Sequence, residues 1–144
     1  MKEENNINTL DELNNGCCMG MDALEVILEK VKGKEFKKLL QKQYDDYAEI
    51  SDKISDLYPK YSDKDPHETS TMNKAMTWYG IQMKTITDSS ESKLAELLLK
   101  GTNMGIIEGR KLLNNKNMDK KIEELLNDYV KIQESCIEKL KKFL

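Results

Sequence analysis

Apolar residues recur along most of the chain at alternating spacings of three and four positions, which is the pattern of an amphipathic α-helix. Gly33 and Pro59 interrupt the pattern, and a polar segment follows Pro59. The pattern predicts four long helices and one shorter helix, and the narrow seam on each predicts helix-on-helix packing. The apolar runs cover residues 10–31, 36–57, 72–86, 94–113 and 122–143.

The order of these runs predicts one all-α domain over residues 1–144. Two helical hairpins, at 6–58 and 90–144, are expected on either side of a crossover at 60–88 that contains the shorter helix. The 144 residues include only 7 Gly and 2 Pro, about half of the usual share of roughly 12%. Because turn formers are rare, we expect few and long elements, arranged as an antiparallel bundle.

The two hairpins share a weak internal repeat. The segment Gly16–Gly20 (GCCMG) aligns with Gly101–Gly105 (GTNMG) at an offset of 85 positions. The second helix aligns with the last one at an offset of 86 positions. The repeated G-x-x-M-G at equivalent places indicates a duplicated hairpin.

Two similar hairpins joined by a long crossover resemble the ferritin-like superfamily, and the chain looks most like small uncharacterised ferritin-like proteins of low-GC bacteria. The resemblance covers about residues 6–144 as architecture. Members of that superfamily hold a di-metal centre with two Glu residues and two Glu-x-x-His motifs. This sequence has no Glu-x-x-His, and its single histidine, His67, lies in the polar crossover segment. The resemblance therefore implies a ferritin-like four-helix bundle without the di-iron centre, and we expect no cofactor.

Polar residues interrupt the inward stripes of the second and last helices at mid-height. They are Gln43 and Tyr47 in one helix and Tyr129 and Gln133 in the other. The four-residue spacing places both members of a pair on one helical face. Under the 86-residue offset Gln43 matches Tyr129 and Tyr47 matches Gln133. We favour a hydrogen-bonded layer that fixes helix register, and the alternative is a small-ligand site made by the same four residues.

Carboxylates on the long helices offer a second route to metal binding. Glu108 is the strongest candidate ligand because it falls near the inward face of the fourth helix. Asp46 and Glu49 lie beside the inward stripe, where we expect them to be solvated or paired with a lysine. Asp22 and Glu25 are further candidates. Oxygen ligands alone would suit Mn or Mg.

Five glycines fall inside the predicted helices, although each costs about 1 kcal/mol relative to alanine there. They predict close backbone approach between the first and fourth helices; space for a ligand or a helix kink are the alternatives. These glycines are Gly16, Gly20, Gly101, Gly105 and Gly109.

The three cysteines do not predict a disulfide framework, because their number is odd and two are adjacent. Cys17 and Cys136 fall on apolar stripes, so we expect small buried hydrophobes rather than redox groups. Cys18 lies beside its stripe. Free thiols suit a reducing compartment, and together with the polar N-terminus they predict a cytoplasmic location.

Charge and hydropathy limit the partners. The net charge is -3 with no basic patch, which argues against nucleic acid, and no apolar stretch approaches the ~18–20 residues of a membrane span. The third helix carries apolar residues on two faces, which predicts a homodimer. The proposed contact residues are Met72, Met76, Trp78 and Met83.

The motifs of common enzymes are missing from the sequence. One histidine and no G-x-S-x-G leave no catalytic triad, and neither a P-loop nor a dinucleotide fingerprint is present. We therefore expect a non-enzymatic structural or interaction bundle. The alternatives are a carboxylate-bound metal protein of the ferritin or rubrerythrin type and a small-ligand binder that uses the Gln/Tyr layer.

Overall fold

The computed structural model describes residues 2–66, 77–82, 87–115 and 117–144. All regular secondary structure in these ranges is helical, with no β-strand. Residues 77–82 form a helical stretch within the crossover, where a shorter helix was expected. The predicted all-α class is confirmed, with four long helices. The elements are α1 (Lys2–Leu28), α2 (Lys34–Leu57), η1 (Tyr58–Lys60), α4 (Glu91–Asn115), α5 (Lys120–Leu140) and η2 (Lys141–Phe143).

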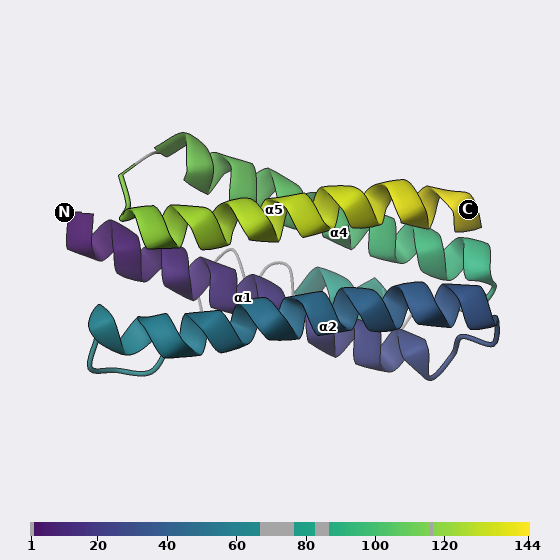
Figure 1. Ribbon diagram of the computed structural model, residues 1–144. Helices are drawn as coiled ribbons and strands as arrows, with labels where there is room; N and C mark the ends of the chain where they lie inside the picture. Colours follow the sequence, from purple (N-terminus) through teal and green to yellow (C-terminus); the bar gives the residue numbers. More distant parts are fainter. Residues whose placement is uncertain (1, 67–76, 83–86, 116) are drawn as a thin grey trace.

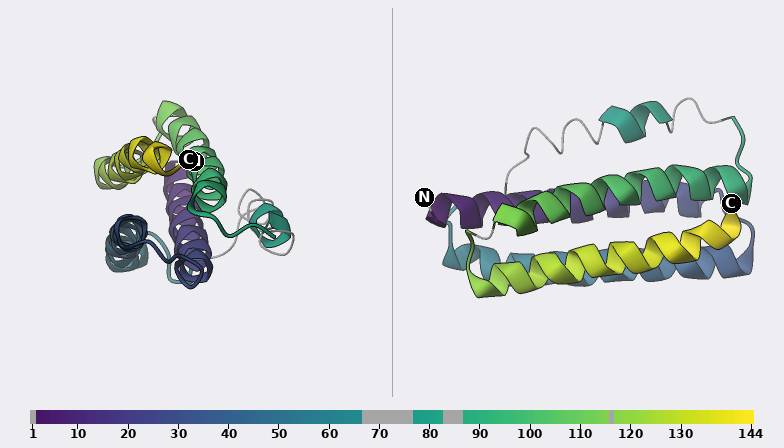
Figure 2. Two further views of the ribbon diagram at one scale, coloured as in Figure 1. Left: turned by 90° about the vertical axis from the view of Figure 1, so that its right-hand side faces the viewer. Right: turned by 90° about the horizontal axis from the view of Figure 1, so that it is seen from above.

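The long helices pack lengthwise as two hairpins. In Figure 1, α1 lies along α2 and α4 lies along α5. The end-on view in Figure 2 shows that the hairpins stack, with α2 beside α5 and α1 beside α4. The helical stretch of residues 77–82 lies outside the α1 and α4 side of the bundle (Figure 2).

The buried faces of α2 and α5 follow the predicted stripes. Every residue of the α2 stripe is buried, including its two polar members, Gln43 and Tyr47. The α5 stripe is buried from Ile122 to Leu140. Burial of these side chains removes a continuous apolar seam from water, which is the main stabilising contribution to the bundle. The buried α2 residues are Phe36, Leu40, Gln43, Tyr47, Ile50, Ile54 and Leu57.

Local signals set the limits of α2. Gly33 precedes the helix with an extended backbone (φ -72°, ψ 132°), so the chain changes direction there. Pro59 occupies the first turn of η1, where its missing N–H breaks the α-helical hydrogen-bond pattern. The predicted breaks at Gly33 and Pro59 are confirmed.

Polar contacts fasten the beginning of α1 to its neighbours. The Tyr58 hydroxyl donates to Asp11 Oδ1 at 2.8 Å, and this carboxylate is only 1% exposed. The Asp119 backbone N–H, at the start of α5, donates to Asn6 Oδ1 at 2.8 Å. The beginning of α1 is thereby tied both to η1 and to the connection between α4 and α5.

None of the helices in the part of the chain that the structure describes has the length and apolar content that a membrane span requires.

Candidate functional site

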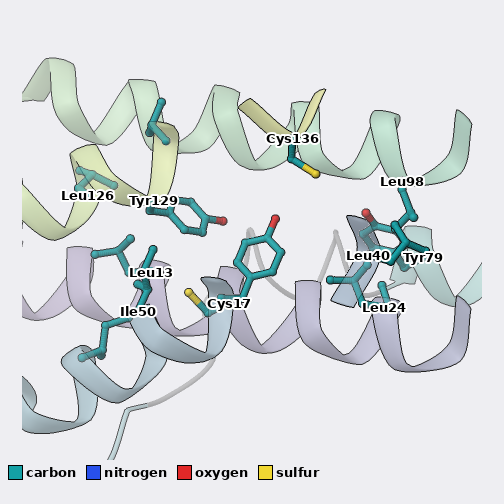
Figure 3. Packing of buried hydrophobic residues seen from close by; sticks show 14 of the residues in the cluster. Leu13, Cys17, Leu24, Leu40, Ile50, Tyr79, Leu98, Leu126, Tyr129 and Cys136 are labelled. Carbon is teal, nitrogen blue, oxygen red and sulfur yellow. The ribbon is translucent and has the colours of Figure 1, made fainter. Parts of the chain in front are cut away.

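The structure brings the four predicted polar residues together at the centre of the bundle. Gln43 and Tyr47 project from α2, and Tyr129 and Gln133 project from α5; none is more than 6% exposed. The Tyr47 and Tyr129 ring centroids are 6.2 Å apart, with the rings tilted by 49°. Figure 3 shows Tyr129 pointing into the interior, together with Leu13 and Cys17. We call Gln43, Tyr47, Tyr129 and Gln133 the central layer.

The hydrogen bonds of the central layer form a chain in which Gln43 donates to Tyr47 and Tyr47 donates to Gln133. Gln43 Nε2 donates to the Tyr47 hydroxyl at 3.4 Å, and this hydroxyl donates to Gln133 Oε1 at 3.1 Å. Gln133 Nε2 donates to the backbone carbonyl of Tyr129 at 3.3 Å. Gln43 Nε2 also donates to Thr102 Oγ1 of α4 at 3.2 Å. The layer therefore links α2 to both helices of the second hairpin.

One buried atom of this network lacks a hydrogen-bond partner in the described part of the chain. Gln43 Oε1 is buried and accepts no hydrogen bond from the residues that the structure describes. The two ends of the layer are consequently unequal, because Gln133 uses its oxygen and its nitrogen whereas Gln43 uses only its nitrogen.

The helix glycines accommodate the central layer. A Cβ atom on Gly20 would lie 2.6 Å from Tyr47 Cε2, and one on Gly105 would lie 3.0 Å from Gln133 Cδ. A Cβ on Gly16 would lie 3.0 Å from Tyr129 Cζ. The nearest atoms in each case are side chains rather than the backbone of a neighbouring helix. The expectation that these glycines serve close backbone approach is therefore wrong; they make room for bulky side chains.

The glycine contacts follow the internal repeat. Gly20 faces Tyr47 within the first hairpin, and Gly105 faces Gln133 in the same way within the second. The glycines are 85 positions apart and their partners 86, as in the sequence alignment. The duplicated motif thus has an equivalent structural role in both hairpins.

The two hairpins differ at the position that Tyr79 contacts. Gly16 faces the Tyr129 hydroxyl, but its counterpart Gly101 faces the hydroxyl of Tyr79, from the helical stretch of residues 77–82. Gln43, the counterpart of Tyr129, is shorter and ends at Thr102. Tyr79 is 8% exposed, so this phenol anchors the crossover stretch in the core.

Burial keeps the central phenols and thiols protonated. It raises the pKa of Tyr47 and of Tyr129 well above the ordinary value of 10. Burial likewise raises the pKa of Cys136 to about 12 and that of Cys17 further still. At neutral pH these groups carry no charge, and the amides of the layer do not titrate. The centre can donate and accept hydrogen bonds, but these groups do not supply a general base.

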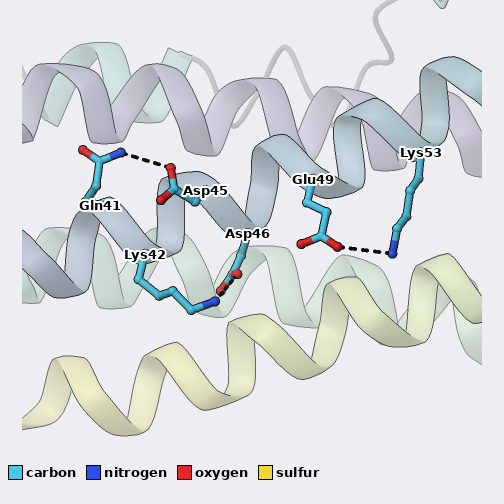
Figure 4. Close-up of polar contacts among 6 residues, drawn as sticks. All are labelled: Gln41, Lys42, Asp45, Asp46, Glu49 and Lys53. Atoms are coloured by element: carbon cyan, nitrogen blue, oxygen red, sulfur yellow. Dashed lines mark hydrogen bonds and ion pairs between the residues drawn. The ribbon is translucent and has the colours of Figure 1, made fainter.

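The candidate metal ligands on the long helices do not converge on this centre. Glu108 lies on α4 with a side chain that is 41% exposed. Its Oε1 pairs with Lys111 Nζ at 3.4 Å. Asp46 pairs with Lys42 at 2.5 Å and Glu49 with Lys53 at 3.6 Å, both along the length of α2 (Figure 4). The expectation that these two carboxylates pair with lysines is confirmed.

The remaining pair of candidate carboxylates lies at the α1–α2 contact. Burial and the neighbouring Glu25 raise the pKa of Asp22. Glu25 Oε1 accepts a hydrogen bond of 3.0 Å from the Tyr44 hydroxyl. Within the described ranges, no three His, Cys, Asp or Glu side chains group closely enough to hold a metal ion. The phenols and amides of the central layer do not fit the di-metal carboxylate centre that a ferritin-like fold implies.

Several predicted residues lie outside the described part of the chain, namely His67, Met72, Met76 and Met83. Of the proposed dimer contacts only Trp78 is described. It is partly buried and packs edge-on against Tyr79, with ring centroids 5.1 Å apart.

Two members of the site escaped the sequence reasoning. Thr102 accepts from Gln43, and Tyr79 fills the space beside Gly101. Thr102 carried a usable signal, because the repeat aligns it with the buried Cys17 and so predicts an inward position. Tyr79 lay on a predicted apolar stripe, but nothing in the stripe indicates which helices it contacts.

Comparisons of the chain with protein-family models, with curated proteins and with solved structures find no match in any of the three.

Proposed function

We propose that this protein is a non-enzymatic structural or interaction module with the antiparallel ferritin-like arrangement of four helices. The observation that carries the proposal is the central layer. At the height where a ferritin-like bundle would gather metal ligands, Tyr47 and Gln133 join the hairpins by a hydrogen bond of 3.1 Å. The layer fixes how the hairpins fit together, as a buried polar residue fixes register in coiled coils.

The arrangement of the helices supports the ferritin-like part of the proposal. Neighbouring long helices run in opposite directions in Figure 1, and α2 ends at one end of the bundle whereas α4 begins at the other. That long connection lets the second hairpin begin at the end where α1 and α2 meet. A simple up-and-down bundle has short connections throughout.

The chemistry of the layer supports the non-enzymatic part. Its amides do not titrate, and its phenols have a raised pKa because they are buried. General acid–base catalysis near neutral pH works best with a group whose pKa lies near the operating pH. The central layer is suited to a role in structure rather than in proton transfer.

The proposed homodimer and the cytoplasmic location stay predictions. Two apolar residues of the helical stretch 77–82 support a contact between copies. Ile81 is 55% exposed, and Trp78 is partly buried. Light scattering tests the dimer, and a monomer across the accessible concentration range would contradict it.

Two substitutions in the layer test its structural role. Gln133→Leu removes the acceptor of the Tyr47 hydroxyl, and an unsatisfied buried donor costs about 1–3 kcal/mol of unfolding free energy. Adding Tyr47→Phe removes that donor, so the double variant should regain most of the loss. Gln41→Leu is the matched control, because Gln41 is exposed on α2 and its side chain donates to the exposed Asp45 on the same helix. Its expected effect is within about 0.5 kcal/mol.

Urea unfolding followed by circular dichroism measures these differences. If Gln133→Leu is as stable as the parent protein, the layer does not hold the hairpins together. Elemental analysis of protein purified without chelator tests the other part of the proposal. Stoichiometric Mn, Fe or Zn would overturn it in favour of a carboxylate-bound metal protein.

A further inference from the structure

A pocket of about 550 Å³ opens between α1, α4 and α5, beside Trp78. It lies on the α1 and α4 side of the bundle, where the helical stretch of residues 77–82 runs (Figure 2). Sites for small organic molecules commonly have volumes of roughly 300–1,000 Å³. The pocket therefore has the size of a small-ligand site.

Apolar side chains form most of the wall of this pocket. At Gly16 and Gly109 the space of a missing side chain is filled by Tyr129 and Val130, so the inner wall consists of side chains rather than open backbone. Such a wall suits an aliphatic or aromatic body. The apolar lining residues are Leu13, Met19, Trp78, Met104, Ile107, Leu112, Leu126 and the ring of Tyr129.

The charged lining residues favour a neutral ligand, because each of them already has a partner. Lys111 pairs with Glu108 at 3.4 Å, and the Lys111 side chain is 69% exposed. Glu12 takes part in an interaction of its own. An ionic ligand would lose its hydration in the pocket without gaining a free counter-charge, which is costly.

The Tyr129 hydroxyl supplies a hydrogen-bond donor at the inner wall. Tyr129 is 5% exposed, and its hydroxyl lies beside Gly16, another lining residue. Among the residues described, none accepts the proton of this hydroxyl, and the neighbouring Gln133 uses its oxygen for Tyr47 and its nitrogen as a donor. Burial raises the pKa of the phenol well above 10, so the proton stays in place at neutral pH. A ligand acceptor would give this donor the partner that the described chain does not.

Trp78 adds an aromatic surface that is held in position. Its ring packs edge-on against Tyr79, with ring centroids 5.1 Å apart, and Tyr79 is anchored in the core at 8% exposure. Aromatic rings attract one another in tilted or offset contacts beyond the effect of area burial. The apolar body of the ligand is therefore best matched by an aryl group.

We propose that this pocket binds a neutral aryl-alkyl compound with one hydrogen-bond acceptor, such as a ketone, ether or ester. The acceptor receives the proton of the Tyr129 hydroxyl, and the aryl body lies against Trp78 and the apolar side chains of the wall. This site goes beyond the structural role of the central layer, of which only Tyr129 lines the pocket. Binding here can succeed or fail whether or not that layer joins the hairpins.

Trp78 is the only tryptophan of the chain, so its fluorescence reports on this pocket directly. The probes are 4-phenylbutan-2-one, which is neutral and carries an acceptor, butylbenzene, which has none, and 4-phenylbutanoate, which is charged at neutral pH. The ketone should change the Trp78 emission saturably and bind at least about fivefold more tightly than the carboxylate, because burial of an unpaired charge is costly. Isothermal titration calorimetry provides a measurement that does not depend on the fluorophore.

Tyr129→Phe tests the hydrogen bond to the ligand. It should weaken ketone binding about twofold to tenfold while butylbenzene binding is unchanged, because only the ketone loses an interaction with the hydroxyl. Tyr44→Phe is the matched control, since the Tyr44 hydroxyl on α2 donates to Glu25 at 3.0 Å and Tyr44 is not a lining residue. It should leave both affinities unchanged. Circular dichroism confirms that the variants fold.

The carbonyl infrared band of the bound ketone tests the same hydrogen bond in the unaltered protein. A hydrogen bond from Tyr129 should place the band at lower wavenumber than in hexane. This measurement keeps the proposal testable if Tyr129→Phe does not fold.

Three results would overturn the proposal. The first is the absence of saturable ketone binding by both fluorescence and calorimetry. The second is equal or tighter binding of the carboxylate probe. The third is a bound ketone that has a hexane-like carbonyl band or that a folded Tyr129→Phe variant binds as tightly as the parent protein does. The stability of the Gln133→Leu variant decides the role of the central layer separately, so failure of one proposal is distinguishable from failure of the other.

Discussion

Substitution of Gly20 by alanine separates two opposing effects on helix stability. In an open helix interior, Gly→Ala stabilises by about 1 kcal/mol because glycine has the greater backbone freedom when unfolded. At Gly20 the added Cβ would lie 2.6 Å from Tyr47 Cε2 and 3.0 Å from Cδ2 and Cζ of the same ring. The ring is 3% exposed and its hydroxyl donates to Gln133. It cannot turn away without leaving the central layer.

The expected sign is therefore opposite to that of an ordinary helix. Overpacking of a core costs about 1–3 kcal/mol, and a displaced Tyr47 hydroxyl loses a hydrogen bond of about 0.5–1.5 kcal/mol. After the gain in helix propensity, Gly20→Ala should lower the unfolding free energy by about 0.5–3.5 kcal/mol. Gly80→Ala is the matched control, because an added Cβ there meets nothing within 4 Å. It should not destabilise the protein.

Urea unfolding followed by circular dichroism gives these differences as shifts of the midpoint at a constant slope. A double-mutant cycle with Tyr47→Leu identifies the cause, since the two substitutions should couple by about 1–3 kcal/mol. If Gly20→Ala raises stability as it would in an open helix, Tyr47 is not packed against Gly20. Additivity of Gly20→Ala and Tyr47→Leu would refute the same contact.

Two further predictions concern the titratable groups. In the folded protein Cys18 should react first with a thiol reagent, because Cys17 and Cys136 are buried; mass spectrometry after a brief exposure should find label on Cys18, and early label on Cys136 would contradict the packing. Burial and the hydrogen bond to Asp11 raise the pKa of Tyr58 from 10 to about 12, and burial also raises the pKa of Tyr47. Since the folded-state pKa is the higher one, the stability from these phenols is complete below pH 10 and is lost as the pH rises through the folded-state pKa. Phenolate absorbance should rise together with loss of helical circular dichroism between about pH 10 and 12, whereas full ionisation near pH 10 in a folded chain would show that the rings are solvated.

Prediction from the sequence succeeded where one helix carries the whole signal. A helix repeats every 3.6 residues, so its buried stripe can be read from spacing without knowledge of the neighbours. The apolar run predicted over residues 36–57 coincides with the buried face of α2, which extends from Phe36 to Leu57. The same reasoning placed Gln43 and Tyr47 on one inward face, and Tyr129 and Gln133 on another.

The prediction for the helix glycines was wrong because what packs against them depends on side chains from other helices. The glycine spacing correctly indicated that something occupies the missing side-chain positions, but not what occupies them. Gly105 faces Gln133 from α5, and Gly101 faces Tyr79 from the crossover stretch. A small residue on one helix leaves the same space for a backbone, a phenol or an amide.

The sequence by itself determined the all-helical class, the helix breaks at Gly33 and Pro59, and the inward position of the central polar residues. These features follow from local periodicity and from backbone chemistry. Only the tertiary structure decided that Tyr47 donates to Gln133 and that Gln43 donates to Thr102, while Gln43 Oε1 finds no partner among the described residues. It also decided that a pocket opens beside Trp78. These features depend on the distances and rotations between helices, which many side chains set together and no single stripe encodes.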